Sequence, residues 1–284
     1  MKRYRILGMD FDARVNLLNM PIGDQATPEV NQLMLNNQQL VREGLLTEYG
    51  VNDSAQKLQN FRELGPALPS VLTFHNNFMR QIRNSFVIGS YYPALTGACA
   101  LGERILNHLL LNLREFYRST QEYKRVCNKD SFDDWDIPIK TLAAWDVLLP
   151  DVVTNFDKLK KQRHSALHFN PATDHNDREL ALSAIKTLAA IINDQFGALE
   201  PKPWFIPGNI GIAFIKCESE EVPFVKVVYL PNCRLVGPRH TLDMSANRWV
   251  PRDGYQYEDR TITDEEFIQL FKDANNRPPI PQGG

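Results

Sequence analysis

Histidine and basic side chains gather in one short segment of the 284-residue chain. Three of the six histidines lie within twelve residues and follow a cluster of cations: His164, His168 and His175, preceded by Lys158, Lys160, Lys161 and Arg163. No acidic residue occurs between Asp157 and Asp174. Cationic side chains bind phosphates, and imidazole exchanges protons near neutral pH. The segment therefore carries the residue types for phosphate chemistry, although a basic run is also typical of a solvated helix face.

The helix predicted from Asp151 to about His168 places Arg163 in the middle of an apolar stripe. At about 100° per residue, this stripe comprises Val152, Phe156, Leu159, Ala166 and Leu167. Because a guanidinium keeps its charge, an arginine in such a stripe needs a carboxylate, a phosphate or backbone carbonyls as its partner. Two interpretations stay open: an internal ion pair with Glu103 or Glu179, or a cleft along the stripe that a phosphate enters.

His164 and His168 are four residues apart and lie near the rim of the same helix face. Metal-free cleavage of RNA needs a cation and a proton-transferring group together. The ribose 2′-OH attacks the adjacent phosphate, a base removes its proton, an acid protonates the leaving 5′ oxygen, and a fixed cation stabilises the phosphorane. Arg163 and the two histidines therefore predict cleavage that leaves 2′,3′-cyclic phosphate and 5′-hydroxyl ends.

The segment Arg163-His164-Ser165-Ala166-Leu167-His168 also resembles the R-polar-x-x-x-H signature of the HEPN superfamily. This superfamily of helical proteins includes many metal-independent endoribonucleases of toxin, antiviral-defence and RNA-processing systems. Its motif lies near the end of a late helix that follows a long opening helix. Here Tyr91 to Tyr117 is predicted to be the opening helix, and the resemblance covers Ser70 to Leu199.

The resemblance implies roles for individual residues. Arg163 and His168 would be the catalytic pair, with His164 as the polar residue beside the arginine. HEPN proteins usually act as dimers in which two copies of the motif face one cleft, which would place the apolar stripe at a protomer interface.

A metal site is the chief alternative for the same residues. His164 and His168 have the i, i+4 spacing that puts two imidazoles on one metal, and three neighbours could complete the shell: His175, Asp174 or Asp177. However, Ser165 stands where an H-E-x-x-H protease has glutamate, and the cationic flank opposes a divalent ion. We therefore predict neither a metal nor another cofactor.

Composition bounds the protein without deciding its function. With 43% hydrophobic residues, 23% charged residues and a formal net charge of −2, the chain is a typical globular protein, so nucleic acid would need a local basic patch. The four cysteines form no CxxC pair, which argues against a zinc ribbon or a dithiol site. No apolar run approaches the roughly 20 residues of a membrane span, and charges at Asp10, Asp12 and Arg14 interrupt the start where a signal peptide is apolar. A cytoplasmic protein without membrane contact is expected.

Hydrophobic periodicity and turn residues predict the elements that must position the motif. A strand or extended arm is predicted within Tyr4–Leu18. The predicted helices are Glu29–Leu64 with a break near Gly50 and an end at Gly65, then Tyr91–Tyr117, Pro138–Leu149, Asp151–His168, Asp177–Phe196 and Thr263–Asp273. The predicted strands are Ile210–Lys216, Val222–Leu230 and Arg234–Val236.

These elements predict a mainly α protein, α+β overall. Residues 1–69 would form a partly helical N-terminal segment, 70–200 an HEPN-like helical bundle, and 201–284 a small β-containing domain with a disordered tail. The expected function is a metal-independent endoribonuclease, of the kind found among toxins and antiphage effectors. It would act as a homodimer on RNA held by Lys158, Lys160 and Lys161, and the C-terminal domain would bind a trigger or inhibitor, either a protein or a small ligand. The alternative is a non-catalytic dimeric module that binds a protein, a nucleotide or RNA, with Arg163 serving only the interface.

Overall fold

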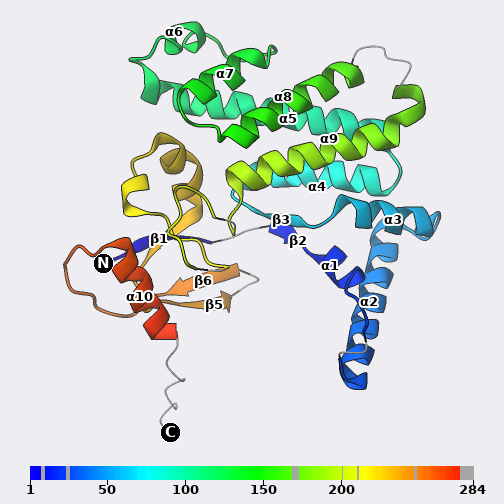
Figure 1. Ribbon diagram of the computed structural model, residues 1–284, viewed down its shortest axis with the longest axis horizontal. Coiled ribbons are helices and arrows are strands. Elements are labelled where there is room, and N and C mark those ends of the chain that lie inside the picture. Colours follow the sequence, from blue (N-terminus) through cyan, green and yellow to red (C-terminus); the bar gives the residue numbers. More distant parts are fainter. Residues whose placement is uncertain are drawn as a thin grey trace. The chain divides into compact units, whose positions relative to one another are not determined.

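The computed structural model in Figure 1 describes residues 1–7, 10–23, 26–167, 173–199, 201–209, 211–245 and 248–275. The chain forms two compact units, the helical unit Asp10–Phe196 and a mixed unit that combines Met1–Met9 with Gly197–Gly284. This division differs from the three consecutive segments expected from the sequence. The first residues join the mixed unit because strand β1 (Arg3–Ile6) pairs antiparallel with β4 (Cys233–Val236).

Four helices form the core of the helical unit: α4 (Thr73–Val87), α5 (Tyr91–Leu113), α8 (Pro150–Leu167) and α9 (Thr173–Phe196). Helix α5 contacts the other three and also α7 (Asp136–Ala144), so it lies at the centre of the bundle (Figure 1). Its small and aliphatic residues are buried along most of its length. The long helix predicted from Tyr91 is confirmed as far as Leu113, after which the chain continues as a 3-10 helix, Arg114–Tyr117.

Glycine allows α5 to approach its neighbours closely. A Cβ at Gly102 would lie 2.6 Å from Leu159 Cδ2 and 2.9 Å from Trp135 Cη2, so neither neighbour leaves room for a methyl group. A Cβ at Gly97 would lie 3.0 Å from Ile82 Cγ1. The two glycines thus mark close helix contacts of α5, with α8 at Gly102 and with α4 at Gly97.

Gly102→Ala is expected to lower the free energy of unfolding by about 1–3 kcal/mol, because Leu159 or Trp135 must leave its packed position. Gly44→Ala is the matched control, since Gly44 also lies inside a helix but a Cβ added there would meet nothing within 4 Å. There the gain in helix propensity should stabilise the protein by up to about 1 kcal/mol. Urea unfolding of both variants measures the difference, and equal effects would contradict the close approach of α5 and α8.

The beginning of the helical unit contains α1 (Arg14–Leu18), α2 (Pro28–Tyr49) and α3 (Ser54–Leu64). Thr27 caps α2, with its hydroxyl oxygen accepting from Val30 N at 3.4 Å. Gly50 follows the end of α2 and Gly65 follows the end of α3, with φ of 80° and 69°, as the sequence predicts. A short antiparallel pair, β2 (Asp10–Asp12) with β3 (Ala67–Ser70), brings the start of the unit back to the segment before α4.

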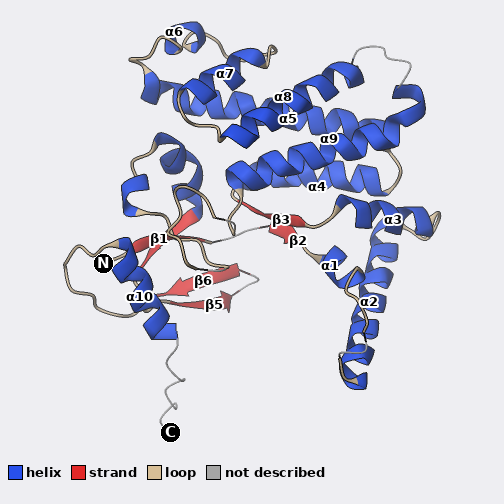
Figure 2. Cartoon of the chain, viewed as in Figure 1, coloured by secondary structure: helices blue, strands red, loops and turns tan. Residues whose placement is uncertain are grey.

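The connection between α5 and α8 contains α6 (Tyr123–Val126) and α7. The helix predicted over Pro138–Leu149 starts two residues earlier, at Asp136, and ends at Ala144. The last helix predicted for the unit, Asp177–Phe196, is confirmed as part of α9. Helix α9 itself begins at Thr173, but Asn176, just before the predicted start, has non-helical dihedral angles. Figure 2 shows that the described part of the unit is helical apart from the short β2–β3 pair and the loops.

The mixed unit departs most from expectation. Arg234–Val236 is confirmed as part of β4, and Thr263–Asp273 is largely confirmed by α10 (Asp264–Asn275). The predicted strand Val222–Leu230 is wrong, because Val225–Tyr229 forms a π-helix and Leu230–Asn232 a 3-10 helix. The strand predicted over Ile210–Lys216 is reduced to isolated bridges within 211–216, from Phe214 to Arg5 and from Ile215 to Phe205.

A hairpin that the sequence did not reveal, β5 (Thr241–Ser245) with β6 (Arg248–Arg252), completes the strands described in the mixed unit. The core of this unit is apolar and includes four residues from near the end of the chain: Ile262, Phe267, Ile268 and Phe271. Phe214 packs edge-on against Phe267, with ring centroids 5.0 Å apart. Within the described ranges, no helix combines the length and apolar composition needed to cross a bilayer.

Candidate functional site

Helix α8 presents its apolar stripe to the interior of the helical unit. Val152, Phe156 and Leu159 are fully buried and Ala166 is almost so. Helix α8 packs against α5, α7 and α9 of the same chain, so the buried residues of the stripe are already covered. The placement of this stripe at a protomer interface, which the resemblance implied, is therefore wrong. Intramolecular packing explains the stripe without a second copy.

Arg163 extends from this stripe to a carboxylate on α5. Its Nη2 lies 3.0 Å from Glu103 Oε2, and its guanidinium carbon lies 5.8 Å from the centroid of the Trp135 ring. Trp135 Nε1 donates to the same Glu103 oxygen at 3.1 Å. Of the two internal partners considered, Glu103 is the one found, whereas Glu179 faces Arg178 with their closest atoms 3.9 Å apart.

The Arg163–Glu103 pair is open to solvent. The two side chains keep 28% and 30% of their exposure, respectively. Among the described residues, the Arg163 guanidinium forms this one ion pair and one cation–π contact, with the face of Trp135. A guanidinium has five N–H donors, so this arrangement leaves donors available to an oxyanion. The site can therefore hold a phosphate while Glu103 fixes the direction of the arginine.

The three lysines predicted to hold RNA differ in their surroundings. Lys160 Nζ lies 2.7 Å from Asp136 Oδ1 and 3.3 Å from Asp157 Oδ1. The hydrogen bond to Asp136 raises the pKa of Lys160 above its usual value. Two carboxylates thus offset the Lys160 charge, which makes it a weak phosphate contact. Lys158 and Lys161 are exposed on α8.

The histidines of the motif are described only in part. His164 is exposed on the last turn of α8, next to Arg163, and His175 is exposed near the start of α9. His168, predicted to be the acid-base residue, lies outside the described residues, as does the Asp174 side chain. Among the side chains that are described, no group of three or more histidine, cysteine, aspartate or glutamate could hold a metal ion.

Two other histidines have partners that sequence reasoning did not find. His75 packs edge-on against His108, with ring centroids 5.0 Å apart. Burial lowers the pKa of His75 to about 4, so its ring is neutral at pH 7. His240 stacks on Phe271, with centroids 5.5 Å apart, and its Nδ1 lies 2.6 Å from the Gly237 carbonyl oxygen. Both are packed side chains, and neither is part of the Arg163 site.

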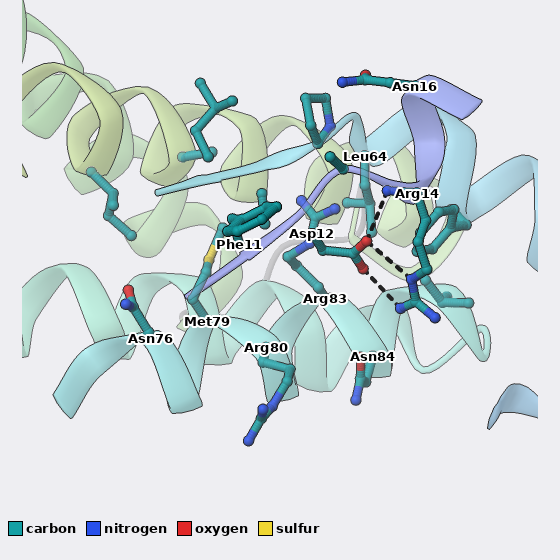
Figure 3. A pocket seen from close by; sticks show the side chains of 18 of the residues that line it. Phe11, Asp12, Arg14, Asn16, Leu64, Asn76, Met79, Arg80, Arg83 and Asn84 are labelled. Atoms are coloured by element: carbon teal, nitrogen blue, oxygen red, sulfur yellow. Dashed lines mark hydrogen bonds and ion pairs between the residues drawn. The ribbon is translucent and has the colours of Figure 1, made fainter. Parts of the chain in front are cut away.

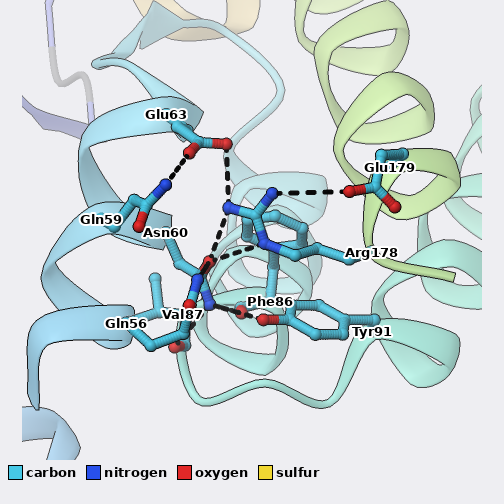
Figure 4. A network of polar contacts seen from close by, with 9 residues as sticks. All are labelled: Gln56, Gln59, Asn60, Glu63, Phe86, Val87, Tyr91, Arg178 and Glu179. Atoms are coloured by element: carbon cyan, nitrogen blue, oxygen red, sulfur yellow. Dashed lines mark hydrogen bonds and ion pairs between the residues drawn. The ribbon is translucent and has the colours of Figure 1, made fainter. Parts of the chain in front are cut away.

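A polar network joins α3, α9, the end of α4 and the start of α5 (Figure 4). Arg178 Nη2 lies 2.9 Å from Glu63 Oε2 and donates to Asn60 Oδ1 at 3.0 Å. Asn60 Nδ2 in turn donates to the Phe86 carbonyl at 3.1 Å and to Tyr91 Oη at 3.1 Å. Each charged group in this network has a partner, so the network is suited to holding helices together. Arg163 has fewer contacts with the described chain, and that contrast makes it the better functional candidate.

Comparisons with protein-family models, with curated proteins and with solved structures each find no match to this chain. Its function is therefore inferred from the residues and their geometry.

Proposed function

We propose that this protein is a metal-independent endoribonuclease of the HEPN type, with its active site at the end of α8. One observation carries the proposal: Arg163 lies in a buried stripe, yet its side chain is partly exposed, and Glu103 is its only ion-pair partner among the described residues. An arginine with that much unused donor capacity, next to His164 and five residues before His168, fits phosphate chemistry better than a purely structural ion pair.

In this mechanism the ribose 2′ oxygen attacks the adjacent phosphorus, and the bond from phosphorus to the 5′ oxygen breaks. His168 transfers the proton, either taking it from the 2′-OH or giving it to the leaving 5′ oxygen. Arg163 donates to the non-bridging oxygens, whose negative charge grows in the phosphorane. His164 assists, and Lys158 and Lys161 hold the RNA backbone, with Lys160 contributing less because of its two carboxylate partners.

The proposal includes a homodimer in which two copies of the α8 end face one cleft, as in the HEPN proteins that the motif resembles. Since the apolar stripe is buried within one chain, such a dimer would use the exposed end of α8 and its surroundings. The proposal also includes a trigger or inhibitor, a protein or a ligand, bound by the mixed unit in a toxin or antiphage system.

The second candidate is a non-catalytic interaction module. The Arg163–Glu103 pair favours it, because a cation neutralised by a carboxylate and placed over Trp135 can serve the fold alone. The two candidates differ in what Arg163 does for RNA, so an activity measurement separates them.

Purified protein incubated with RNA in excess EDTA is expected to cleave it and to leave 2′,3′-cyclic phosphate ends. His168→Ala should lower the cleavage rate by about 100-fold or more, which is typical for loss of a general acid or base. His175→Ala is the matched control, since His175 is exposed on α9 and has no role in the mechanism.

Loss of cleavage in EDTA would contradict the proposal, as would equal rates for the parent protein and His168→Ala. If the protein needs a cellular trigger, expression in growing cells tests it instead: the parent protein should be toxic and His168→Ala should not. If neither RNA cleavage nor toxicity occurs, the interaction module is the correct assignment.

A further inference from the structure

The helical unit contains a cavity of about 740 Å³ that is separate from α8. It lies among β2, β3, the helices α1 to α4 and α9, and none of the residues described on α5 or α8 lines it (Figure 3). Apolar side chains make up much of its wall: Phe11, Leu17, Phe61, Leu64, Met79, Val87 and Ile192. Small-molecule sites in proteins have volumes of roughly 300–1,000 Å³, so the cavity is large enough for a ligand of that kind.

Arg83 of α4 is the unusual residue in the wall. It is only 7% exposed, yet it forms no ion pair with any described carboxylate. Its one hydrogen bond within the described chain runs from Nη2 to the Gly65 carbonyl at 2.6 Å. Burial lowers the pKa of Arg83 below its usual value. A buried guanidinium normally has a carboxylate partner, because desolvating an unpaired charge costs several kcal/mol.

The acidic groups near Arg83 are already engaged by another arginine. Asp12 Oδ1 accepts from Arg14 Nε at 3.0 Å, and Asp12 Oδ2 lies 2.8 Å from Arg14 Nη2. Glu48 Oε2 accepts from Arg14 Nη1 at 2.7 Å. Figure 3 shows the Asp12 carboxylate turned toward Arg14. Asp12 thus attracts the Arg83 charge only from beyond ion-pair distance, and no described carboxylate contacts the Arg83 guanidinium on the cavity wall.

The charges on the cavity wall define the class of ligand. Arg14, Arg80 and Arg83 oppose Asp12 and Glu48, which leaves one net positive charge. A ligand with a single negative charge restores neutrality, whereas a multiply charged phosphate exceeds it. The apolar wall and Phe11, which is 62% exposed beside the cavity, favour a ligand with an apolar body.

We propose that this cavity binds an organic monoanion, with its acid group on Arg83 and its apolar body against Phe11, Met79 and Ile192. The acid group supplies the acceptors that the guanidinium lacks, and the body displaces water from the apolar wall. The proposal is independent of the ribonuclease assignment, since the two sites share no residue.

Isothermal titration calorimetry with three probes tests the ligand class. Octanoate carries both the charge and the apolar body, 1-octanol carries only the body, and inorganic phosphate carries only the charge. Octanoate should bind and the other two should bind at least about tenfold more weakly, as expected for loss of a hydrogen bond to a charged group. Equal binding of octanoate and octanol, preferred binding of phosphate, or no binding of octanoate would overturn the proposal.

Arg83→Met tests the residue, with Arg62→Met as its control at an exposed position of α3 that is not part of the cavity wall. Octanoate affinity should fall at least about tenfold in Arg83→Met and no more than about threefold in Arg62→Met. The melting temperature of ligand-free Arg83→Met should stay equal or rise, because an unpaired buried charge is removed. A purely structural Arg83 would give the opposite result, a lower melting temperature with unchanged binding.

Ala189→Phe keeps the test decisive if Arg83→Met does not fold. Ala189 lines the cavity from α9, so a phenyl ring there should block octanoate while Arg83 stays in place. Undiminished octanoate binding by this variant would place the ligand elsewhere and overturn the proposal.

Discussion

Arg163→Ala is expected to lower the rate of RNA cleavage about 100- to 1,000-fold, the usual cost of removing one donor that stabilises a developing oxyanion. The methyl side chain cannot reach a phosphate, and it also leaves the Glu103 carboxylate without its cation. The loss should appear in kcat more than in KM, because the charge on the non-bridging oxygens grows toward the phosphorane. Single-turnover cleavage of a short RNA measures the rate directly.

Variants of Glu103 test whether Arg163 acts on the phosphate or only neutralises the Glu103 carboxylate. Its carboxylate holds Arg163 through one 3.0 Å contact and also accepts from Trp135, so Glu103→Gln should loosen the arginine and slow cleavage by about tenfold. In the double variant Arg163→Ala with Glu103→Gln, no unpaired carboxylate remains to repel the phosphate. The double variant should therefore cleave at least as fast as Arg163→Ala alone, which is a non-additive result.

Arg163→Lys is the conservative control, because lysine keeps the charge but has a compact ammonium in place of the planar fork. It should recover only part of the lost rate. If Arg163→Ala cleaves RNA at the parental rate while its stability falls, Arg163 is a structural residue and the ribonuclease proposal is wrong.

The helices of the helical unit could be predicted because their apolar residues repeat every three to four positions and their ends carry strong stop signals. Gly50 and Gly65 end α2 and α3 with positive φ, as their sequence positions indicate. Helix α4 was missed although Met79, Ile82 and Phe86 have helical spacing and are buried. The polar residues between them obscured a signal that was present in the sequence.

The mixed unit could not be predicted in the same way, because tertiary contacts override local preference there. The valine-rich segment before Tyr229 favours a strand by composition, yet Val225–Tyr229 is a π-helix. Tyr229 is buried beside Trp204, with ring centroids 5.3 Å apart, and its hydroxyl donates to the Gly197 carbonyl at 3.1 Å. The pairing of β1 with β4 joins residues from distant parts of the chain, which no local pattern indicates.

The candidate site was predictable as a set of alternatives. The register of α8 identified Arg163 as an unusual cation, and Glu103 was one of the two internal partners considered. The contact of Arg163 with Trp135 was not foreseen. Trp135 belongs to the connection between α5 and α8, and sequence spacing does not show that this connection folds back onto both helices. Arg83 gave no sequence signal: its importance depends on Asp12 and Glu48 being paired with Arg14, and that pairing is visible only in the structure.

Asn60→Ala is expected to destabilise the helical unit by about 3 kcal/mol. Asn60 is fully buried on α3, and its amide donates to the carbonyls of Phe86 and Val87 at 3.1 and 3.3 Å. These carbonyls lie at the end of α4, where the Phe86 carbonyl also accepts from Gly89 N at 3.1 Å. Alanine would therefore remove one of the donors to Phe86 and, among the described residues, the hydrogen-bond donor of the Val87 carbonyl.

The same substitution also removes an acceptor of Arg178, whose Nε and Nη2 lie 3.2 and 3.0 Å from Asn60 Oδ1. For a unit of this size, a loss of about 3 kcal/mol lowers the melting temperature by about 6–12 °C. Gln59→Ala, on the exposed face of α3, removes only a surface hydrogen bond to Glu63 and should change stability by less than about 0.5 kcal/mol. Asn60→Asp keeps an acceptor for Arg178 but lacks the amide donors, so its stability should lie between that of Asn60→Ala and that of Gln59→Ala. If Asn60→Ala has the melting temperature of the parent protein, the Asn60 amide does not stabilise the end of α4 and the prediction is wrong.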